Sequence, residues 1–214
     1  MAAWLLLALS IGVDLSPDPG TPARLHVRID QGGGLNSPQL RMVVAEIQKI
    51  WGSAGVQVTT GGYGDPVPSD GAIVSMRVVS LELPASRPPI LGWVTADVHR
   101  QMTPTIFVSL NAVSALLAAA SYKGLSFNAQ PVVLRERLMA QAIGRVAAHE
   151  LGHYFLRTSQ HDEHGLMRRT YSPTDLTGPG LERFQIQPAV RSTVRLEVAA
   201  LTVRQASNTH SFHR

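Results

Sequence analysis

The chain has 214 residues, of which 44% are hydrophobic and 16% are charged, and its formal net charge is +4. This length suffices for one domain with its own core, and the composition is apolar for a soluble protein but not typical of a membrane protein. The sequence has no cysteine, which excludes disulfides, thiolate zinc sites and cysteine nucleophiles, and no basic block with interleaved aromatic residues that would indicate nucleic-acid binding.

The N-terminal segment is expected to precede the folded domain. Its apolar run, Ala2–Val13, is too short to span a bilayer as a helix, but its length is typical of the hydrophobic region of a secretory signal. It therefore predicts a secreted or periplasmic location, although no lysine or arginine precedes it and no clear cleavage site follows. A misplaced start codon or a buried terminal segment are the alternatives. The stretch Ser16–Pro22 predicts a linker, so residues 1–22 are set apart from the domain.

A strand and a helix open the predicted domain. Apolar and polar residues alternate over Leu25–Ile29, which predicts a β-strand. After the glycine-rich turn Gly32–Gly34, Ser37 is expected to be the N-cap of a helix, with Pro38 at the first helical position. Apolar residues then recur with a 3.6-residue period as far as Trp51.

The rest of the chain predicts strands first and helices afterwards. Alternating or β-branched segments predict three or four further strands, over Val56–Thr60, Ala72–Ser80, Gly92–Val98 and Thr105–Leu110. Helical periodicity predicts a long helix from Pro131 to about Leu156 and a last helix over about Ala189–Gln205. This order indicates an α+β fold with one domain over residues 23–206 and a flexible tail over residues 207–214.

One short stretch concentrates the histidines. The sequence AAHELGHYFLRTSQHDEHGLMR, residues 147–168, holds four of the eight in the chain. His149 and His153 are four residues apart, so on a helix they lie on one face and can bind the same metal ion. Glu150 is turned about 100° around the axis, where it can reach a water on that ion instead of binding the ion itself. Two histidines and a nearby carboxylate are the arrangement that metal-assisted hydrolysis requires.

A chance origin of this HExxH motif is the simplest alternative, with the histidines as ordinary polar residues of a surface helix. Roughly 0.01 random matches are expected in a chain of this composition, and the residues around the motif are apolar. Catalytic zinc commonly has three protein ligands and a water. The candidates for the third are His161, Asp162, Glu163 and His164, and a histidine is the better ligand. His161 is preferred over His164, because His164 leaves only two residues before Met167.

The HELGH motif, a later histidine and the sequence GLM together resemble the metzincin clan of zinc metallopeptidases, with the pattern HExxHxxGxxH and a methionine turn. The resemblance implies zinc as cofactor, Glu150 as general base, Met167 as the methionine of the turn, and His149, His153 and His161 as metal ligands. It also implies a zincin-like fold: a mixed, twisted sheet of four to five strands, a long active-site helix carrying HExxH, and a C-terminal helix.

Two departures from the metzincin pattern affect the loop after the helix. Leu156 stands where the pattern has a glycine, and His161 comes two residues later than the third histidine of the pattern. The chain is therefore expected to turn through a longer loop that uses ordinary backbone conformations. Tyr154 and Tyr171 are candidates to stabilise a transition-state oxyanion, although packing or rim positions would also account for them.

The resemblance implies a zinc metalloendopeptidase that hydrolyses a peptide or protein substrate. Gly92–Val98 resembles the edge strand along which the substrate chain of such enzymes lies antiparallel. Two alternatives stay open. In the first, the protein is a zinc peptidase whose third ligand is acidic, with Asp175 or Glu182 in place of His161. In the second, the protein is a zinc-stabilised peptide-binding domain without turnover. The presence of Glu150 favours an enzyme, because a binding domain has no need of a general base.

Overall fold

The computed structural model describes residues 22–30, 34–62, 64–66, 68, 70–80, 90–99, 101–122 and 124–211. The predicted signal-like segment, most of the linker and most of the glycine-rich turn at 32–34 lie outside these residues, so the predictions made for them stay predictions. Among the helices of the described ranges, none has both the length and the apolar composition needed to cross a membrane.

The sheet has five strands in the order β2-β1-β3-β5-β4. Their bounds are Ala23–Asp30 (β1), Val56–Gly61 (β2), Ala72–Val79 (β3), Gly92–Ala96 (β4) and Met102–Ser109 (β5). Strands β1, β2, β3 and β5 run parallel, whereas β4 pairs with β5 in the antiparallel direction and forms one edge. The predicted mixed sheet is confirmed, and the strand expected at the edge, β4, lies there.

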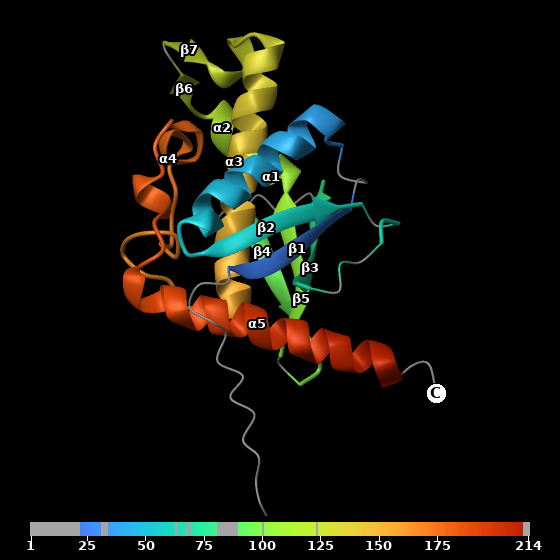
Figure 1. The fold of residues 1–214 in the computed structure, drawn as a ribbon. Coiled ribbons are helices and arrows are strands. Elements are labelled where there is room, and N and C mark those ends of the chain that lie inside the picture. The colour runs from blue at the N-terminus through green and yellow to red at the C-terminus, as the bar shows by residue number, and fades with distance from the viewer. Residues whose placement is uncertain are drawn as a thin grey trace, which may run out of the picture.

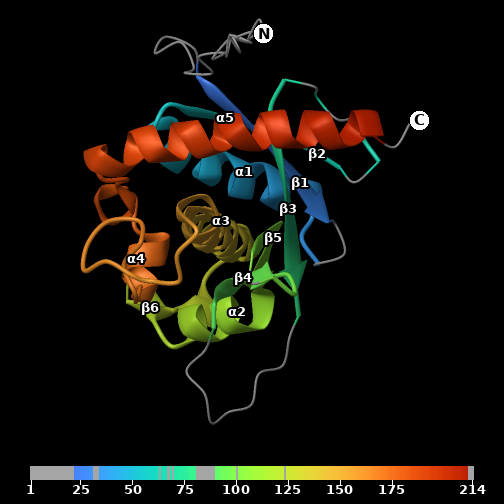
Figure 2. The same ribbon diagram turned by 90° about the horizontal axis from the view of Figure 1, so that it is seen from below.

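The helices follow the order expected for an α+β fold, which is confirmed. They are α1 (Ser37–Gly52), α2 (Leu110–Ala118), α3 (Val132–Leu156), α4 (Pro173–Thr177) and α5 (Pro188–Ser211), with short 3-10 turns η2 (Phe127–Ala129) and η3 (Glu182–Phe184) and a small hairpin of β6 (Ser121–Tyr122) and β7 (Leu125–Ser126). Helices α1 and α3 cover one face of the sheet, and α5 crosses one end of the domain (Figures 1 and 2). The long helix carrying HExxH on a mixed sheet is the predicted zincin-like arrangement.

Helix α5 is tied to the sheet through a side chain. The amide of Gln205 accepts from the N–H of Ile73 and donates to its C=O, so it satisfies the backbone of β3 as a neighbouring strand would. Helix α5 extends to Ser211, six residues past the expected end at Gln205. Helices α2 and α4 were not predicted, and Leu110, assigned to a strand, instead begins α2, because Ser109 ends β5 and caps α2 directly.

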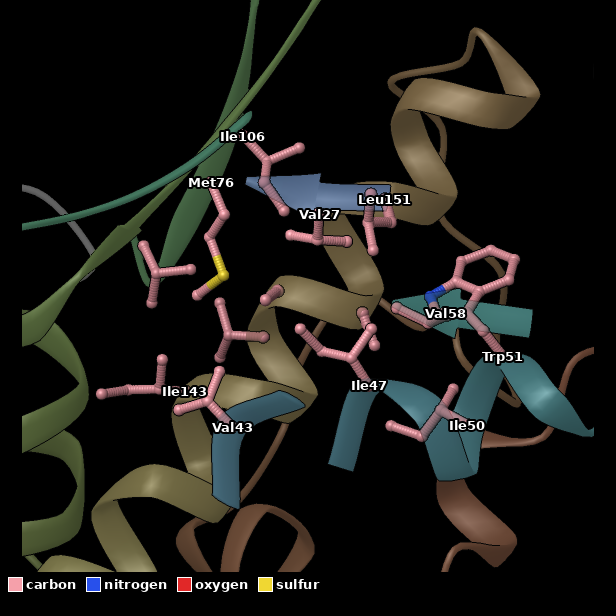
Figure 3. Close-up of a cluster of buried hydrophobic side chains, with 14 of the residues drawn as sticks. Val27, Val43, Ile47, Ile50, Trp51, Val58, Met76, Ile106, Ile143 and Leu151 are labelled. Atoms are coloured by element: carbon pink, nitrogen blue, oxygen red, sulfur yellow. The ribbon is translucent and has the colours of Figure 1, made fainter. Parts of the chain in front are cut away.

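The main core lies between the sheet and helices α1 and α3 (Figure 3). Alternate residues of β1 are buried in it, and Val27 belongs to the same buried cluster as Ile47 of α1 and Ile143 of α3. Each such side chain, when fully buried, contributes about 1.5–3 kcal/mol to the free energy of folding. This core holds α3 against the sheet along most of its length, so side chains near the C-terminal end of α3 have a rigid support.

The start of α1 differs by one residue from the prediction. Asn36, not Ser37, is the N-cap: its side chain accepts from the N–H of Gln39, and the Gln39 side chain accepts from the N–H of Asn36. Pro38 lies within the first turn, where its missing N–H costs nothing. The reciprocal pair of bonds explains the difference, because Asn36 and Gln39 satisfy two backbone donors at once.

The end of α3 also corrects the prediction of ordinary backbone conformations. Arg157, directly after Leu156, has φ 49° and ψ 40°, and it is the one non-glycine residue with positive φ in the described ranges. Its N–H donates to the C=O of His153. The chain thus makes the sharp turn without the glycine of the metzincin pattern. A side chain in this backbone conformation costs about 1–2 kcal/mol.

Replacing Arg157 by glycine is expected to remove that cost. The Arg157→Gly variant should be more stable to unfolding than Arg157→Ala by about 1 kcal/mol, because both lose the exposed ion pair with Glu197 and only glycine adopts positive φ without strain. Urea denaturation of the two variants measures the difference. Equal stabilities would show that the turn is not strained.

Candidate metal centre

The last turns of α3 place His149 and His153 on one face, and backbone carbonyls hold both rings. Nδ1 of His149 lies 2.6 Å from the C=O of Leu166, and Nδ1 of His153 lies 2.7 Å from the C=O of Thr158. A carbonyl oxygen can only accept, so each Nδ1 carries the proton and donates it. Each Nε2 therefore presents a lone pair, which is the form that binds a metal ion.

The loop after α3 brings a third imidazole to this pair. Nε2 of His153 lies 2.9 Å from Nε2 of His149 and 3.2 Å from Nε2 of His161. The three rings are the one group of at least three metal-ligating side chains among the described residues, and their ligand atoms lie within 4.8 Å of one another. Lone pairs of His149 and His153 that face each other at this distance repel, and a shared cation removes the repulsion. The donor set therefore fits a metal ion with three nitrogen ligands.

Burial keeps these imidazoles neutral. It lowers the pKa of His149 to about 4, against the opposing effect of the hydrogen bond to Leu166. Burial also lowers the pKa of His153, against the opposing effect of its hydrogen bond to Thr158. His161 is exposed, and its pKa is lowered by partial desolvation and by the positive charge of Arg169. A pKa below the ordinary value means that the ring is uncharged near pH 7, so no proton competes strongly with a metal ion.

The other candidates for a third ligand lie elsewhere. His164 is exposed and borders a separate small pocket with Trp51 and Met167. Asp175 accepts from the N–H of Ser172 and pairs with Arg168 at 3.4 Å. Neither Asp175 nor Glu182 belongs to the group of converging ligands within the described residues.

Glu150 is buried directly beside the metal-binding face. It is 5% exposed, and burial raises its pKa to about 8. A cation held by the neighbouring histidines would oppose this shift by favouring the carboxylate. The side chain fits because Gly92 of the edge strand has no Cβ: a methyl group there would lie 2.8 Å from Cγ and 2.9 Å from Oε1 of Glu150.

The Gly92→Ala variant is therefore expected to displace the carboxylate of Glu150 and to shift the edge strand slightly, because the added methyl group would also lie 2.9 Å from the C=O of Phe107. A misplacement of about 1 Å at a reacting group can cost about 10²-fold in rate, so peptide cleavage should fall by up to that factor while metal content stays the same. Gly52→Ala adds the same methyl group where nothing lies within 4 Å, and it should cleave like the parent. Steady-state kinetics of both variants, with metal analysis, test this. Unchanged cleavage by Gly92→Ala would show that the glycine does not position Glu150.

Met167 lies beneath the helical turn that carries the histidines. It is 7% exposed, and a Cβ added to Gly152 would come within 2.3 Å of its Sδ. The loop that contains it is closed by a hydrogen bond from the N–H of Asp162 to the C=O of Met167, 2.8 Å long. The preceding residue, Leu166, supplies the carbonyl that orients His149. The turn expected around Met167 thus supports the metal-binding face from below.

The two tyrosines have different positions. Tyr171 borders the same cleft as His149, but its hydroxyl donates to the C=O of Leu166, and its ring stacks on Phe184 with centroids 4.9 Å apart. Burial raises the pKa of Tyr171, so it stays protonated and can keep donating. Tyr154 borders a different pocket with Arg157, and none of the three histidines lines that pocket.

The cleft in front of the histidines has a volume of about 410 Å³. Its lining comes from α3 (Val146, His149 and Glu150), from α2 (Leu116), from the first residue of the edge strand and the two residues before it (Gly92, Ile90 and Leu91), and from the later segment (His161, Arg169, Thr170 and Tyr171). The roles of the carbonyls of Leu166 and Thr158, and of Gly92, could not be read from the sequence, because each depends on the path of a loop or on strand pairing.

Comparisons with known proteins show distant similarity to several solved structures, including the following two. The sequence matches no protein-family model and no curated protein. The crystal structure of archaemetzincin from Methanopyrus kandleri aligns with a TM-score of 0.46 and 14% identity, over 85% of this chain and 98% of that one. A zinc-dependent peptidase from Methanocorpusculum labreanum aligns with a TM-score of 0.48 and 12% identity, over 79% and 99% of the two chains. Similarities this distant assign neither a family nor an activity.

Proposed function

We propose that this protein is a zinc-dependent endopeptidase. The observation that carries the proposal is the convergence of three imidazole Nε2 atoms beside one buried carboxylate. Zinc suits a site of three nitrogen ligands and, when bound, would supply Lewis-acid activation of a water and of the scissile carbonyl. His149, His153 and His161 would hold it. Glu150 would accept a proton from the attacking water and pass it to the leaving amine.

The outer edge of β4, which pairs with no other strand of the described residues, supports binding of an extended peptide. The N–H of Ser109 donates to the C=O of Leu91 across the β4–β5 pair, and Gly92 lies opposite Val108. Because hydrogen-bonded and non-bonded positions alternate in an antiparallel pair, the N–H and C=O of Gly92 and Val94 point to the open edge. A substrate strand can pair with these groups.

The position of the edge relative to Glu150 favours cleavage near Gly92. The Glu150 side chain lies directly against this residue, so a peptide paired with β4 would pass the carboxylate there. The register of β4 shifts between Val94 and Ala96, which ends the regular edge after a short stretch. The backbone pairing would therefore hold the residues around the scissile bond, and side-chain contacts in the cleft would supply further affinity.

A digest of a broad peptide library tests the proposed activity. Zinc-loaded protein should cleave internal bonds, a chelator should abolish cleavage, and added zinc should restore it. A zinc-loaded protein that cleaves no member of the library would overturn the proposal, and retained peptide binding would then favour the alternative of a peptide-binding domain without turnover.

The choice of third ligand can be tested separately. His161→Ala is expected to lower the zinc affinity by at least the roughly 10–100-fold seen on loss of an outer-shell partner, because it removes a ligand itself. His164→Ala is the matched control, since His164 is exposed and lies outside the group. Zinc titrations with a competing chelator measure both. Full affinity in His161→Ala together with weakened binding in His164→Ala would reverse the assignment.

A further inference from the structure

A positively charged side chain, that of Arg169, borders the cleft. Most of the lining that is not part of the metal-binding group is apolar, with Leu116 and Val146 among it, but Arg169 borders the same space and is exposed. His161, one of the three metal-binding histidines, lines this space together with Arg169. The guanidinium is therefore within reach of a molecule bound at the histidines.

Arg169 differs from the other arginines of its segment in having no carboxylate partner among the described residues. Arg168 lies 3.4 Å and Arg183 3.8 Å from the carboxylate of Asp175, so both are paired. No ion pair or hydrogen bond within the described part of the chain engages Arg169. Arg168 therefore stabilises the fold through its ion pair. The guanidinium donors of Arg169 remain available to a ligand in the cleft.

The two walls of the cleft explain how a substrate would meet this arginine. One wall is the entry into the edge strand at Ile90–Gly92, and another is the segment Arg169–Tyr171. Figure 2 shows β4 and the segment after α3 to either side of α3. Successive side chains of an extended peptide point in opposite directions. A peptide paired with β4 would therefore direct some of its side chains toward Arg169.

We propose that Arg169 selects peptides that carry a carboxylate close to the scissile bond, so that the preferred substrates are acidic. This inference rests on the proposed function. A guanidinium binds a carboxylate through two parallel hydrogen bonds, which gives directional as well as charge selectivity. The net charge of +4 also favours the approach of acidic chains. The substrate can supply this carboxylate in two ways, from an aspartate or glutamate side chain or from the C-terminus of a short peptide.

Binding measurements with a variant that does not turn over substrate separate this inference from the proposed activity. The probes are fluorescein-labelled decapeptides, measured by fluorescence anisotropy on zinc-loaded Glu150→Gln protein. One set moves a single glutamate along an otherwise neutral, C-terminally amidated sequence, with a glutamine at the same position as reference. A second set compares free-acid and amidated C-termini. The set of probes that shows tighter binding of the acid than of the amide identifies the source of the carboxylate, a side chain or the C-terminus.

We expect the best-placed carboxylate to tighten binding about five- to tenfold over its amide reference, as for a partly exposed charge-assisted pair. Arg169→Gln in the same background should abolish the difference, and Arg169→Glu should favour lysine over glutamate at that position. Arg137→Gln, which changes an exposed arginine near the other end of α3, should preserve the parent preference. Equal binding of acid and amide probes by the Glu150→Gln protein with Arg169 intact would overturn the inference. A preference that persists after Arg169→Gln is added would overturn it as well. Failure of the proposed function would appear separately, as no cleavage by zinc-loaded protein with Glu150 intact.

Discussion

Glu150→Gln is expected to keep the zinc content of the protein unchanged and to lower peptide cleavage by about 10²–10⁴-fold, the usual loss when a general acid–base group is removed. Glutamine has nearly the same shape and fits the same space beside Gly92, so the fold and the three imidazoles are not disturbed. What it lacks is a group that accepts a proton. Peptide affinity should change little, because the backbone groups of the edge strand do not involve this side chain.

Glu163→Gln is the matched control for this prediction. Glu163 is an exposed glutamate of the same histidine-rich stretch and lies outside the metal-binding group. It should cleave like the parent when zinc content and the kcat and KM of one peptide are compared. A Glu150→Gln protein that binds zinc and cleaves as fast as the parent would remove Glu150 from the mechanism.

Arg145→Met is expected to cause the largest loss of stability, about 3–5 kcal/mol in the free energy of unfolding. Arg145 is 1% exposed and forms a 2.7 Å ion pair with Glu46, so methionine would leave a buried carboxylate unpaired. The guanidinium also donates to the carbonyls of Asp175 and Gly180 and lies 4.7 Å from the centre of the Phe184 ring. It therefore joins α3, α1 and the segment that supports the wall of the cleft.

Arg77→Met is the matched control for the buried pair. Arg77 pairs with Asp30 at 3.0 Å, but half of its side chain is exposed, so breaking that pair should cost less than about 1 kcal/mol. Chemical denaturation of both variants and the parent gives the comparison. If Arg145→Met cost no more than Arg77→Met, the buried pair would not hold these elements together.

The metal-binding pair could be predicted because its geometry is local. Four residues on a helix fix the relation of His149 and His153, whatever the rest of the fold does. The helix itself was predictable from its apolar periodicity over a long stretch. The third histidine was harder, since its approach depends on Arg157 entering a conformation that residues other than glycine rarely adopt.

The supporting residues could not be predicted, because they act across the fold. Gly92 matters to Glu150 only because β4 is paired at the edge beside α3, and sequence does not give strand pairing. The carbonyl of Leu166 orients His149, and Leu166 lies in a loop whose path depends on distant contacts. One of these is the hydrogen bond from the N–H of Leu166 to the C=O of Gln185. Helix α2 was missed because β5 passes into it without a turn signal.

A crystal structure of the zinc-loaded protein, with anomalous diffraction data at the zinc edge, tests the metal centre most directly. We expect one anomalous peak about 2.0–2.1 Å from Nε2 of each of His149, His153 and His161, with Nδ1 of the first two still donating to the carbonyls of Leu166 and Thr158. Zinc bound by His164, Asp175 or Glu182 in place of His161, or no zinc at the three imidazoles, would contradict the proposed site.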